Sequence, residues 1–382
     1  MVRKQYDTVI IGGGPAGAAA GLALARQGLS AVIVEKQEDV PDKICGEFFS
    51  PECVSYFSEL GMRPDFFRHD PSPINHVHVS FNGSRIHTMI DTPAYGLSRK
   101  KIDTSLLDVA AQNGIELLRG YEAIRHTQTN GRTNIVVKNR QTEEYRTLSS
   151  KYLIGATGAK SGSESMFAET RRRNTKGSFT VAFKFHAVCP PVSNAIELYF
   201  TPMGYVGIGS IEGGMVNVCG LVDSDLIKSQ YGDIRGVLGE ISKESIPFRE
   251  RCDTMNNISD VITCSNLSFG RRTPIYNDVL CIGDTAGSIH PFCGDGNAMA
   301  LKSGLLSAEA VERAMRLNWD SRRLTRQFNE LWRKEFTSRI MISGLVYYII
   351  THKVTRPAAS VLSGIYPGII NKIFNLTRDS KP

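Results

Sequence analysis

The sequence lacks several features that would identify large classes of protein. Its eight cysteines are scattered, with no Cys-x-x-Cys pair and no His/Cys cluster, so we predict neither disulfides nor a metal site. No apolar run reaches about 20 residues, the length that a bilayer-spanning helix needs. The first apolar strand begins within ten residues of Met1, which leaves no room for a secretory signal. We therefore expect a reduced, cytoplasmic protein.

Positive charge is concentrated near the C-terminus. The chain has 382 residues, 41% of them hydrophobic, and a formal net charge of +7, which fits a globular protein of two to three subdomains. Residues 333–382 carry +6 of that charge, interleaved with short apolar runs. No nucleic-acid recognition module accompanies these residues, so we expect no nucleic-acid partner. Two interpretations stay open: helices that pack over a substrate cavity or a dimer face, which we favour, and peripheral contact of amphipathic helices with anionic membrane lipid.

A glycine-rich motif follows the first apolar strand, residues 8–11. This motif, Gly12-Gly13-Gly14-Pro15-Ala16-Gly17, opens into an Ala-rich helix expected over residues 15–26. Gly12 permits a tight turn, Gly14 lets the backbone approach a pyrophosphate, and Gly17 lets the helix pack closely on the strand. The N-terminus of the helix supplies unpaired N–H groups for the phosphates. The motif thus predicts a nucleotide site, although glycine-rich turns can also be purely structural.

The second strand, residues 30–34, ends in Glu35-Lys36. A carboxylate at this position accepts a hydrogen bond from a ribose hydroxyl, and an acidic residue instead of Arg argues against a 2′-phosphate. We include Lys36 among the cofactor-binding candidates because it follows Glu35 directly. The nucleotide is therefore FAD or NAD and not NADP.

A second motif, far along the chain, favours FAD. An apolar strand over residues 279–282 leads to Gly283-Asp284, and Pro291-Phe292-Cys293-Gly294-Asp295-Gly296-Asn297 precedes a helix expected over residues 298–310. An Asp at the end of a strand can accept from a ribityl hydroxyl, and a glycine-preceded helix N-terminus can face the flavin pyrimidine. Asp284 and Asp295 could instead be ordinary helix caps.

Three further segments occur in a recognisable order with these motifs: Lys43-Ile44-Cys45-Gly46-Glu47 followed by Ser50, Leu97-Ser98-Arg99 with Asp103 and Leu107, and residues 197–200 through Gly204-Tyr205. Over about residues 5–335 the chain resembles the geranylgeranyl reductase branch of the FAD-dependent monooxygenase superfamily, which has the aromatic-hydroxylase fold. The resemblance implies that the Cys45-Gly46-Glu47 loop lies beside the flavin and that Arg99 binds FAD. It also implies that residues 197–205 form a hairpin of the substrate sheet.

The resemblance implies an α/β fold, in which a Rossmann-like FAD-binding domain carries an inserted, mostly antiparallel β-sheet substrate domain and a C-terminal helical region. We assign residues 1–75, 98–165 and 270–330 to the FAD-binding domain, residues 76–97 and 166–269 to the substrate domain, and residues 331–382 to the helical region. The stretch over residues 74–90 predicts a hairpin that turns at Asn82-Gly83, and His76, His78 and His87 alternate along it. We expect them on a solvated face and not as metal ligands.

Three residues are catalytic candidates. His290 has the ordinary pKa of about 6.5 that suits an acid or base, although we favour a structural role in which it anchors its loop. Cys45 is either a mobile flavin-side thiol or a small buried hydrophobe, and Glu47 is a comparable candidate. The substrate pocket is expected between the Cys45 loop, the loop over residues 291–297 and the strands nearby, with Tyr199, Tyr205 and Phe292 in its wall.

Two departures from the family pattern bear on function. Thr157 stands where the family usually has Asp, which leaves the docking of a reductant open. Val206-Gly207-Ile208-Gly209 stands where the reductases carry Trp and Pro, which thins the expected aromatic wall. We therefore expect a monooxygenase that hydroxylates a hydrophobic aromatic or polyketide-like intermediate, with NADH or NADPH as transient electron donor. The alternatives are reduction of isoprenoid double bonds, flavin-dependent halogenation, and a non-catalytic, membrane-recruited flavin-binding protein.

Overall fold

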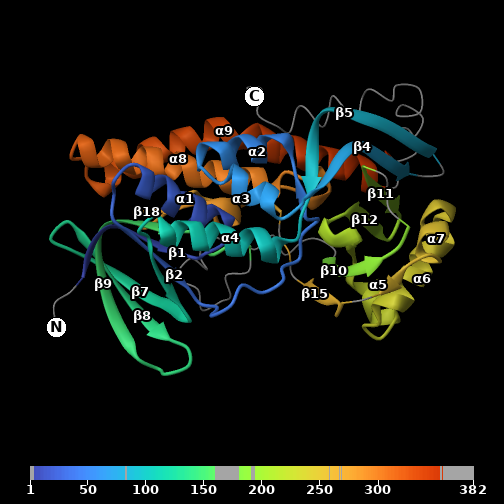
Figure 1. Cartoon of the computed structure of the whole chain (residues 1–382), viewed down its shortest axis with the longest axis horizontal. Helices are drawn as coiled ribbons and strands as arrows, with labels where there is room; N and C mark the ends of the chain where they lie inside the picture. The colour runs from blue at the N-terminus through green and yellow to red at the C-terminus, as the bar shows by residue number, and fades with distance from the viewer. Residues whose placement is uncertain are drawn as a thin grey trace.

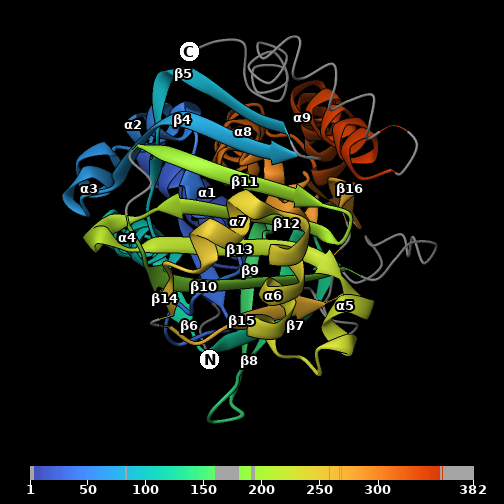
Figure 2. The same ribbon diagram turned by 90° about the vertical axis from the view of Figure 1, so that its right-hand side faces the viewer.

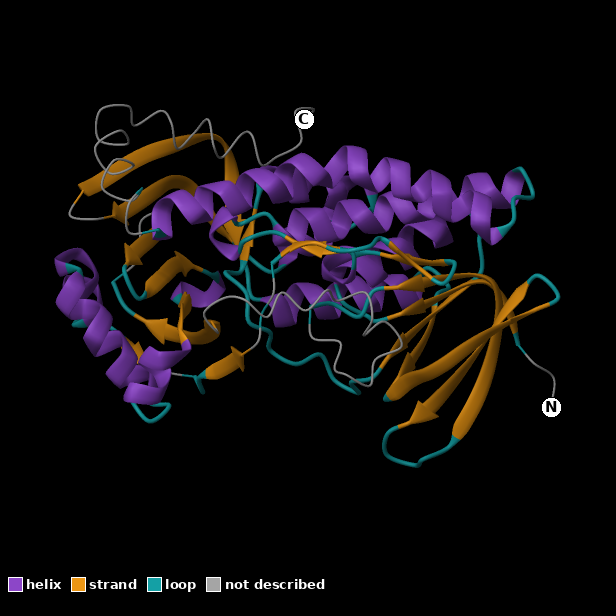
Figure 3. Ribbon diagram, turned by 180° about the vertical axis from the view of Figure 1, so that it is seen from behind, coloured by secondary structure: helices purple, strands orange, loops and turns teal. Residues whose placement is uncertain are grey.

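The computed structural model describes residues 4–352 and 355, apart from residues 82–83, 160–179, 191–193, 258, 266 and 268. Two large β-sheets lie at opposite ends of the long axis of the molecule (Figure 1). Two long helices, α8 (Gly296–Arg316) and α9 (Ser321–Thr351), run side by side from the first sheet toward the second (Figures 1 and 3). They connect the two halves of the molecule.

The first sheet has the strand order β17-β18-β9-β1-β2-β6, and the β7-β8 hairpin joins it through β9. Strands β18, β9, β1, β2 and β6 are parallel. Parallel strands bring their carboxyl ends to one edge, where α/β folds bind their ligands. The ends of β1, β2 and β18 therefore place Gly12, Glu35 and Gly283 at the same edge. The strands are β1 (Gln5–Ile11), β2 (Ala31–Glu35), β6 (Glu116–Arg119), β7 (Tyr121–Thr129), β8 (Arg132–Asn139), β9 (Tyr145–Gly155), β17 (Ile275–Tyr276) and β18 (Val279–Cys281).

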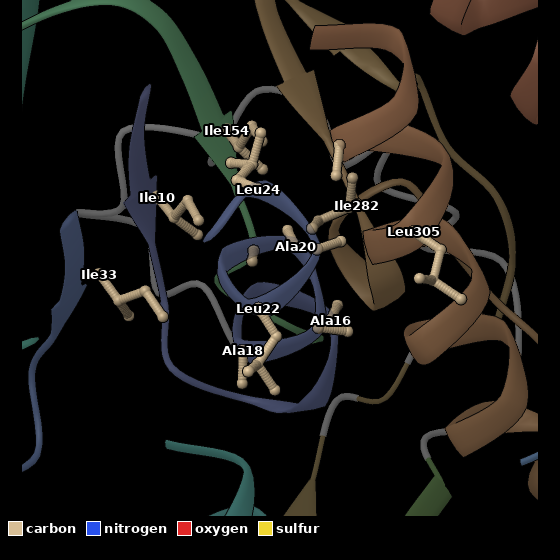
Figure 4. Close-up of a cluster of buried hydrophobic side chains, with 14 of the residues drawn as sticks. Ile10, Ala16, Ala18, Ala20, Leu22, Leu24, Ile33, Ile154, Ile282 and Leu305 are labelled. Atoms are coloured by element: carbon tan, nitrogen blue, oxygen red, sulfur yellow. The ribbon is translucent and has the colours of Figure 1, made fainter. Parts of the chain in front are cut away.

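Helix α1 (Pro15–Arg26) is at the centre of the main core, where residues 16–24 are all buried. It lies between Ile10, Ile33 and Ile154 of the sheet and Leu305 of α8 (Figure 4). Small residues let the two helices approach closely, since a Cβ added at Gly304 would lie 2.5 Å from the Ala16 carbonyl oxygen. This contact brings α8 against the start of α1.

The second sheet has the order β14-β10-β13-β12-β11-β4-β5-β3, with β15 beside β10. All its pairs are antiparallel except β4 with β11. Its strands are β3 (Phe48–Phe49), β4 (Ser72–Phe81), β5 (Ser84–Gly96), β10 (Thr180–Val188), β11 (Ala195–Thr201), β12 (Gly204–Ser210), β13 (Val216–Asp223), β14 (Asn256–Asn257) and β15 (Ile262–Ser265).

The outer face of the second sheet is covered by three short helices, α5 (Ser224–Ser229), α6 (Ile234–Glu244) and α7 (Ile246–Cys252) (Figure 2). Side chains alternate along each strand. Phe183 and Phe185 of β10 pack in the core cluster beneath these helices. Lys184 and His186 point the other way, toward the Cys45 loop. We call this second side the inner face.

The remaining helices are α2 (Pro51–Glu59), α3 (Arg63–Arg68) and α4 (Arg99–Gln112). Two of the predicted domain boundaries fall inside elements: 75/76 within β4 and 330/331 within α9. The expected hairpin turn at residues 82–83 lies outside the described residues. In the hairpin itself His78 and His87 are exposed, and the described residues contain no group of three or more ligands arranged for a metal.

No helix in the described part of the chain is long and apolar enough to cross a membrane. The N-terminal part of the basic region belongs to α9, where Phe336 and Ile340 are in the main core. Residues 356–382 lie outside the described residues. Peripheral membrane contact therefore stays a prediction.

Candidate active site

The three glycines of the first motif have different environments. Gly12 has φ +109°, and a Cβ there would lie 2.3 Å from the Ala156 carbonyl oxygen. A Cβ at Gly17 would lie 2.0 Å from the Gly12 carbonyl oxygen. Both positions therefore require glycine for folding. At Gly14 a Cβ would meet only the Lys43 Nζ, at 3.9 Å, so this side of the turn is open to a ligand.

A narrow cleft lies beside this turn, where the motif predicts the adenosine half of FAD. Both carboxylate oxygens of Glu35 accept backbone N–H groups, Oε2 from Gly13 at 2.7 Å and Oε1 from Gln37 at 3.0 Å. Each carboxylate oxygen can accept a further bond, so Glu35 can still receive a ribose hydroxyl. Lys36 is exposed and is not in the lining. The cleft is lined by Gly13, Glu35, Val40, Lys43, Leu107 and Arg119, among others.

Arg99, which we expected to bind FAD, forms an ion pair within the protein. Its Nε and Nη2 each donate to Asp103 at 2.8 Å, and the Lys43 Nζ lies 3.3 Å from the same carboxylate. Burial of Asp103 opposes its ionisation, but the charges and hydrogen bonds of Arg99 and Lys43 outweigh that effect and hold the pKa of Asp103 below its usual value. Of these two cations, Lys43 lies beside the open side of Gly14, where a pyrophosphate needs positive charge.

The two glycine motifs, distant in sequence, meet in the structure. Gly283 has φ +57°, and a Cβ there would lie 2.9 Å from the Cβ of Ala16. Its N–H donates to Ser303 of α8 at 2.9 Å. Asp284 is exposed at the same edge, where its carboxylate can meet a polyol chain. The residues present therefore fit FAD at both motifs.

Thr157, which replaces the usual family Asp, also contributes to this edge. Its Oγ1 lies 3.4 Å from the Oγ1 of Thr285, which accepts the Gly158 N–H at 3.0 Å. The end of β9 is thereby joined to the turn that carries Asp284.

Cys45 is held between the first domain and the second sheet. Its Sγ accepts from the Glu47 N–H at 3.3 Å and faces the Asn297 Nδ2 at 3.7 Å, while its carbonyl accepts from Asn217 at 3.0 Å. Asn297 also donates to the Phe48 carbonyl at 3.1 Å. The thiol is therefore fixed beside the N-terminus of α8, among hydrogen-bond donors. At the next residue, Gly46, an added Cβ would lie 3.8 Å from the Cys219 Sγ.

Glu47, the second catalytic candidate, is enclosed by other residues. Its side chain is fully buried, and φ at this residue is +54°. Oε1 accepts from Lys184 at 2.6 Å and from the Arg99 N–H at 2.8 Å, and Oε2 lies 2.6 Å from the His186 Nε2. Through these contacts Glu47 joins the Cys45 loop, α4 and β10, and its catalytic role stays a prediction.

Sequence reasoning missed Lys184 and His186. The available signal was the pattern Phe183-Lys184-Phe185-His186, in which charged or polar residues alternate with aromatic ones along a strand. Lys184 is only 1% exposed, and a buried lysine needs a partner. The partner was not readable from the sequence, because 137 residues separate Lys184 from Glu47.

His290 is an aromatic packing residue. Its ring stacks on Tyr347 with centroids 4.1 Å apart and lies 4.7 Å from the Phe269 ring. Burial lowers its pKa to about 4, so it is uncharged at neutral pH and has no imidazolium proton to give. The expected acid or base role therefore gains no support here, and the ring contacts fit the anchoring role.

A pH dependence of stability follows from His290. The unfolded chain takes up a proton at this residue below about pH 6.5, whereas the folded chain does so only below about pH 4. Stability should therefore fall as the pH falls through that window, by at most roughly 3 kcal/mol. In the His290→Phe variant, whose ring does not titrate, this contribution to the pH dependence of stability should vanish. Urea unfolding of both proteins at pH 4.5 and 7.5 checks this, and equal pH dependence in the two would contradict it.

An aromatic cluster forms the inner face of the second sheet, and it contains two of the three predicted pocket residues. Tyr205 and Phe292 lie 6.3 Å apart, Phe200 lies 5.9 Å from Phe292, and Tyr347 of α9 lies 6.2 Å from Phe292. Tyr199 does not join them. Because side chains alternate along β11, its ring faces outward, 5.2 Å from Phe248.

Comparison with known proteins now identifies the family. A family model described as an FAD binding domain matches residues 5–305. The chain belongs to this FAD-binding family. It is 26% identical over 361 residues to a digeranylgeranylglycerophospholipid reductase of Methanocaldococcus jannaschii, which covers 92% of this chain and 88% of the relative. It is 25% identical over 341 residues to a menaquinone reductase of Mycolicibacterium smegmatis, covering 81% and 77%.

A solved structure of a flavin-dependent brominase shares the fold, with a TM-score of 0.77 at 19% identity over 98% of this chain and 93% of that one. Together these findings confirm the α/β fold class and the resemblance to the geranylgeranyl reductase branch. The protein is an FAD-dependent oxidoreductase.

Proposed function

We propose that the protein reduces carbon–carbon double bonds of a hydrophobic, isoprenoid-like substrate. The observation that carries this proposal is the aromatic cluster on the inner face. Our preference for hydroxylation rested on an aromatic wall thinned at Val206 to Gly209. Phe292 and Tyr347, from other parts of the chain, supply rings at this place. The reductase names of the two curated relatives also support the proposal.

The residues of the site have separate roles in this reaction. FAD would be held at the turn of Gly14 and at the edge that carries Glu35 and Asp284, and it would supply hydride transfer from NADH or NADPH to one carbon of the double bond. Tyr205, Phe292 and Tyr347 pack against the apolar chain and exclude water. Cys45 holds a proton at Sγ for the other carbon, and the Glu47 N–H and Asn297 amide fix the sulfur in place. The substrate gains two hydrogens, and solvent restores the thiol proton.

Hydroxylation is the second candidate, because an apolar surface that excludes water also suits it. The two reactions change the mass of the substrate differently, because reduction adds two hydrogens and hydroxylation adds one oxygen atom. The test uses FAD-loaded protein with NADPH or NADH and two probes, geranylgeranyl diphosphate and a menaquinone. Products are analysed by mass spectrometry while an electrode follows oxygen. A gain of two hydrogens without matching oxygen uptake supports reduction, and a gain of one oxygen atom with stoichiometric uptake refutes it.

We expect Cys45→Ala to lower the rate of double-bond reduction by about 10²-fold or more, the usual contribution of a positioned proton donor. The rate at which NADPH reduces the flavin should change little, because that step does not use the thiol proton. Stopped-flow flavin absorbance and product formation measure the two steps separately. Cys53→Ala is the matched control, since Cys53 is a fully buried cysteine of α2. Equal product rates in Cys45→Ala and the wild type would rule out the thiol as donor.

A further inference from the structure

One face of α9 contacts the loop over residues 290–295, which precedes α8. Arg339, Ser343 and Tyr347 are spaced four residues apart and therefore share a face. The Arg339 Nη1 lies 3.5 Å from the Asp295 Oδ2, the Ser343 Oγ accepts from the His290 N–H at 3.5 Å, and the Tyr347 ring stacks on His290 at 4.1 Å. These contacts reach both ends of the loop over residues 290–295.

The Arg339 contact is a buried ionic cluster. The side chain of Asp295 is fully buried and that of Arg339 is 4% exposed. The same guanidinium lies 2.7 Å from the Glu335 Oε1 and 3.5 Å from the Glu52 Oε2. Removing one partner of a buried ion pair leaves an uncompensated charge, which is costly. Asp295 lies between Gly294 and Gly296, and its buried carboxylate therefore depends on Arg339 to balance its charge.

Asp295 directly precedes α8, whose Asn297 amide faces the Cys45 Sγ. In the placement expected from the motif, this helix N-terminus faces the pyrimidine end of the flavin. Reduction of a flavin adds negative charge at that end, so a nearby carboxylate disfavours reduction and a nearby cation favours it.

We propose that Arg339 is a positioning residue for the flavin: through Asp295 it fixes the loop over residues 290–295 and sets the charge beside the pyrimidine, and with it the reduction potential of the bound FAD. The inference depends on where FAD binds and not on the substrate or on double-bond reduction. A failure of the proposed function therefore leaves it standing.

The midpoint potential of the bound FAD tests the proposal, measured by dye equilibration without any substrate. Asp295→Asn, which keeps the shape and removes the charge, should favour reduction about tenfold, or about 30 mV for a two-electron couple. Arg339→Met should shift the potential in the opposite direction. The double variant should return toward the wild-type value. Arg316→Met is the control, because Arg316 pairs with Glu312 on the exposed surface of α8, and its potential should match that of the wild type.

A merely structural role predicts a different result. Arg339→Met would then lose thermal stability and FAD affinity, while the FAD that stays bound keeps the wild-type potential in every variant. That result would overturn the proposal. If Arg339→Met does not fold, Asp295→Asn decides alone, and an unchanged potential in that variant would also overturn it.

Discussion

Replacing Gly14 by valine is expected to give a folded protein that purifies without FAD. The backbone at Gly14 is extended, with φ −71° and ψ 179°, a conformation that any residue adopts. A Cβ there meets nothing nearer than the Lys43 Nζ at 3.9 Å, so the fold tolerates a side chain. The pyrophosphate does not, because it needs that open space to reach the N-terminus of α1. The ratio of flavin to protein absorbance and the melting temperature together measure the outcome.

Two further substitutions control for fold. Gly12→Ala should fail to fold properly, because the added Cβ would lie 2.3 Å from the Ala156 carbonyl oxygen at a φ of +109°. Gly239→Ala in α6, where no atom lies within 4 Å of the new Cβ, should keep both stability and FAD. Full FAD occupancy in Gly14→Val would show that the pyrophosphate does not approach this turn.

The motifs that were readable from the sequence are those whose physical demands are local. Gly12 and Gly17 must be glycine because of atoms a few residues or one strand away, and the Pro15–Arg26 helix was predicted with the bounds that the structure has. The parallel order of β1, β2 and β18 then brings Gly12, Glu35 and Asp284 to one edge, as such sheets do. The convergence of the two motifs follows from these local features and the fold.

Features that depend on tertiary packing were not readable. Tyr199 and Phe200 are adjacent aromatic residues, and only the register of β11 with its neighbours decides that Phe200 faces inward. The contribution of Tyr347 to the aromatic cluster requires α9 to lie across the loop of His290. The pairing of Glu47 with β10 likewise joins segments with no common pattern. These long-range contacts changed our interpretation of Glu47, of His290 and of the reaction.

Replacing Lys184 by methionine is expected to destabilise the protein by about 3–5 kcal/mol, the usual cost of breaking a buried ion pair. Methionine fits the aliphatic space but leaves the fully buried Glu47 carboxylate without its 2.6 Å partner. The double variant Lys184→Met with Glu47→Gln removes both charges and should recover most of that loss. Lys228→Met is the matched control, because Lys228 pairs with Asp225 in solvent, where their side chains are 72% and 83% exposed, and its removal should have no measurable effect.

Urea unfolding of the wild type, Lys184→Met, Glu47→Gln and the double variant gives the coupling free energy between Lys184 and Glu47 directly. A large coupling would mean that the Cys45 loop is held against the second sheet mainly by this charge pair. The position of the thiol relative to the aromatic cluster would then depend on a residue that never meets the substrate. If Lys184→Met is no less stable than Lys228→Met, the pair contributes no net stability, and the loop must be held by the Asn217 and Asn297 amides that bond to Cys45 and Phe48.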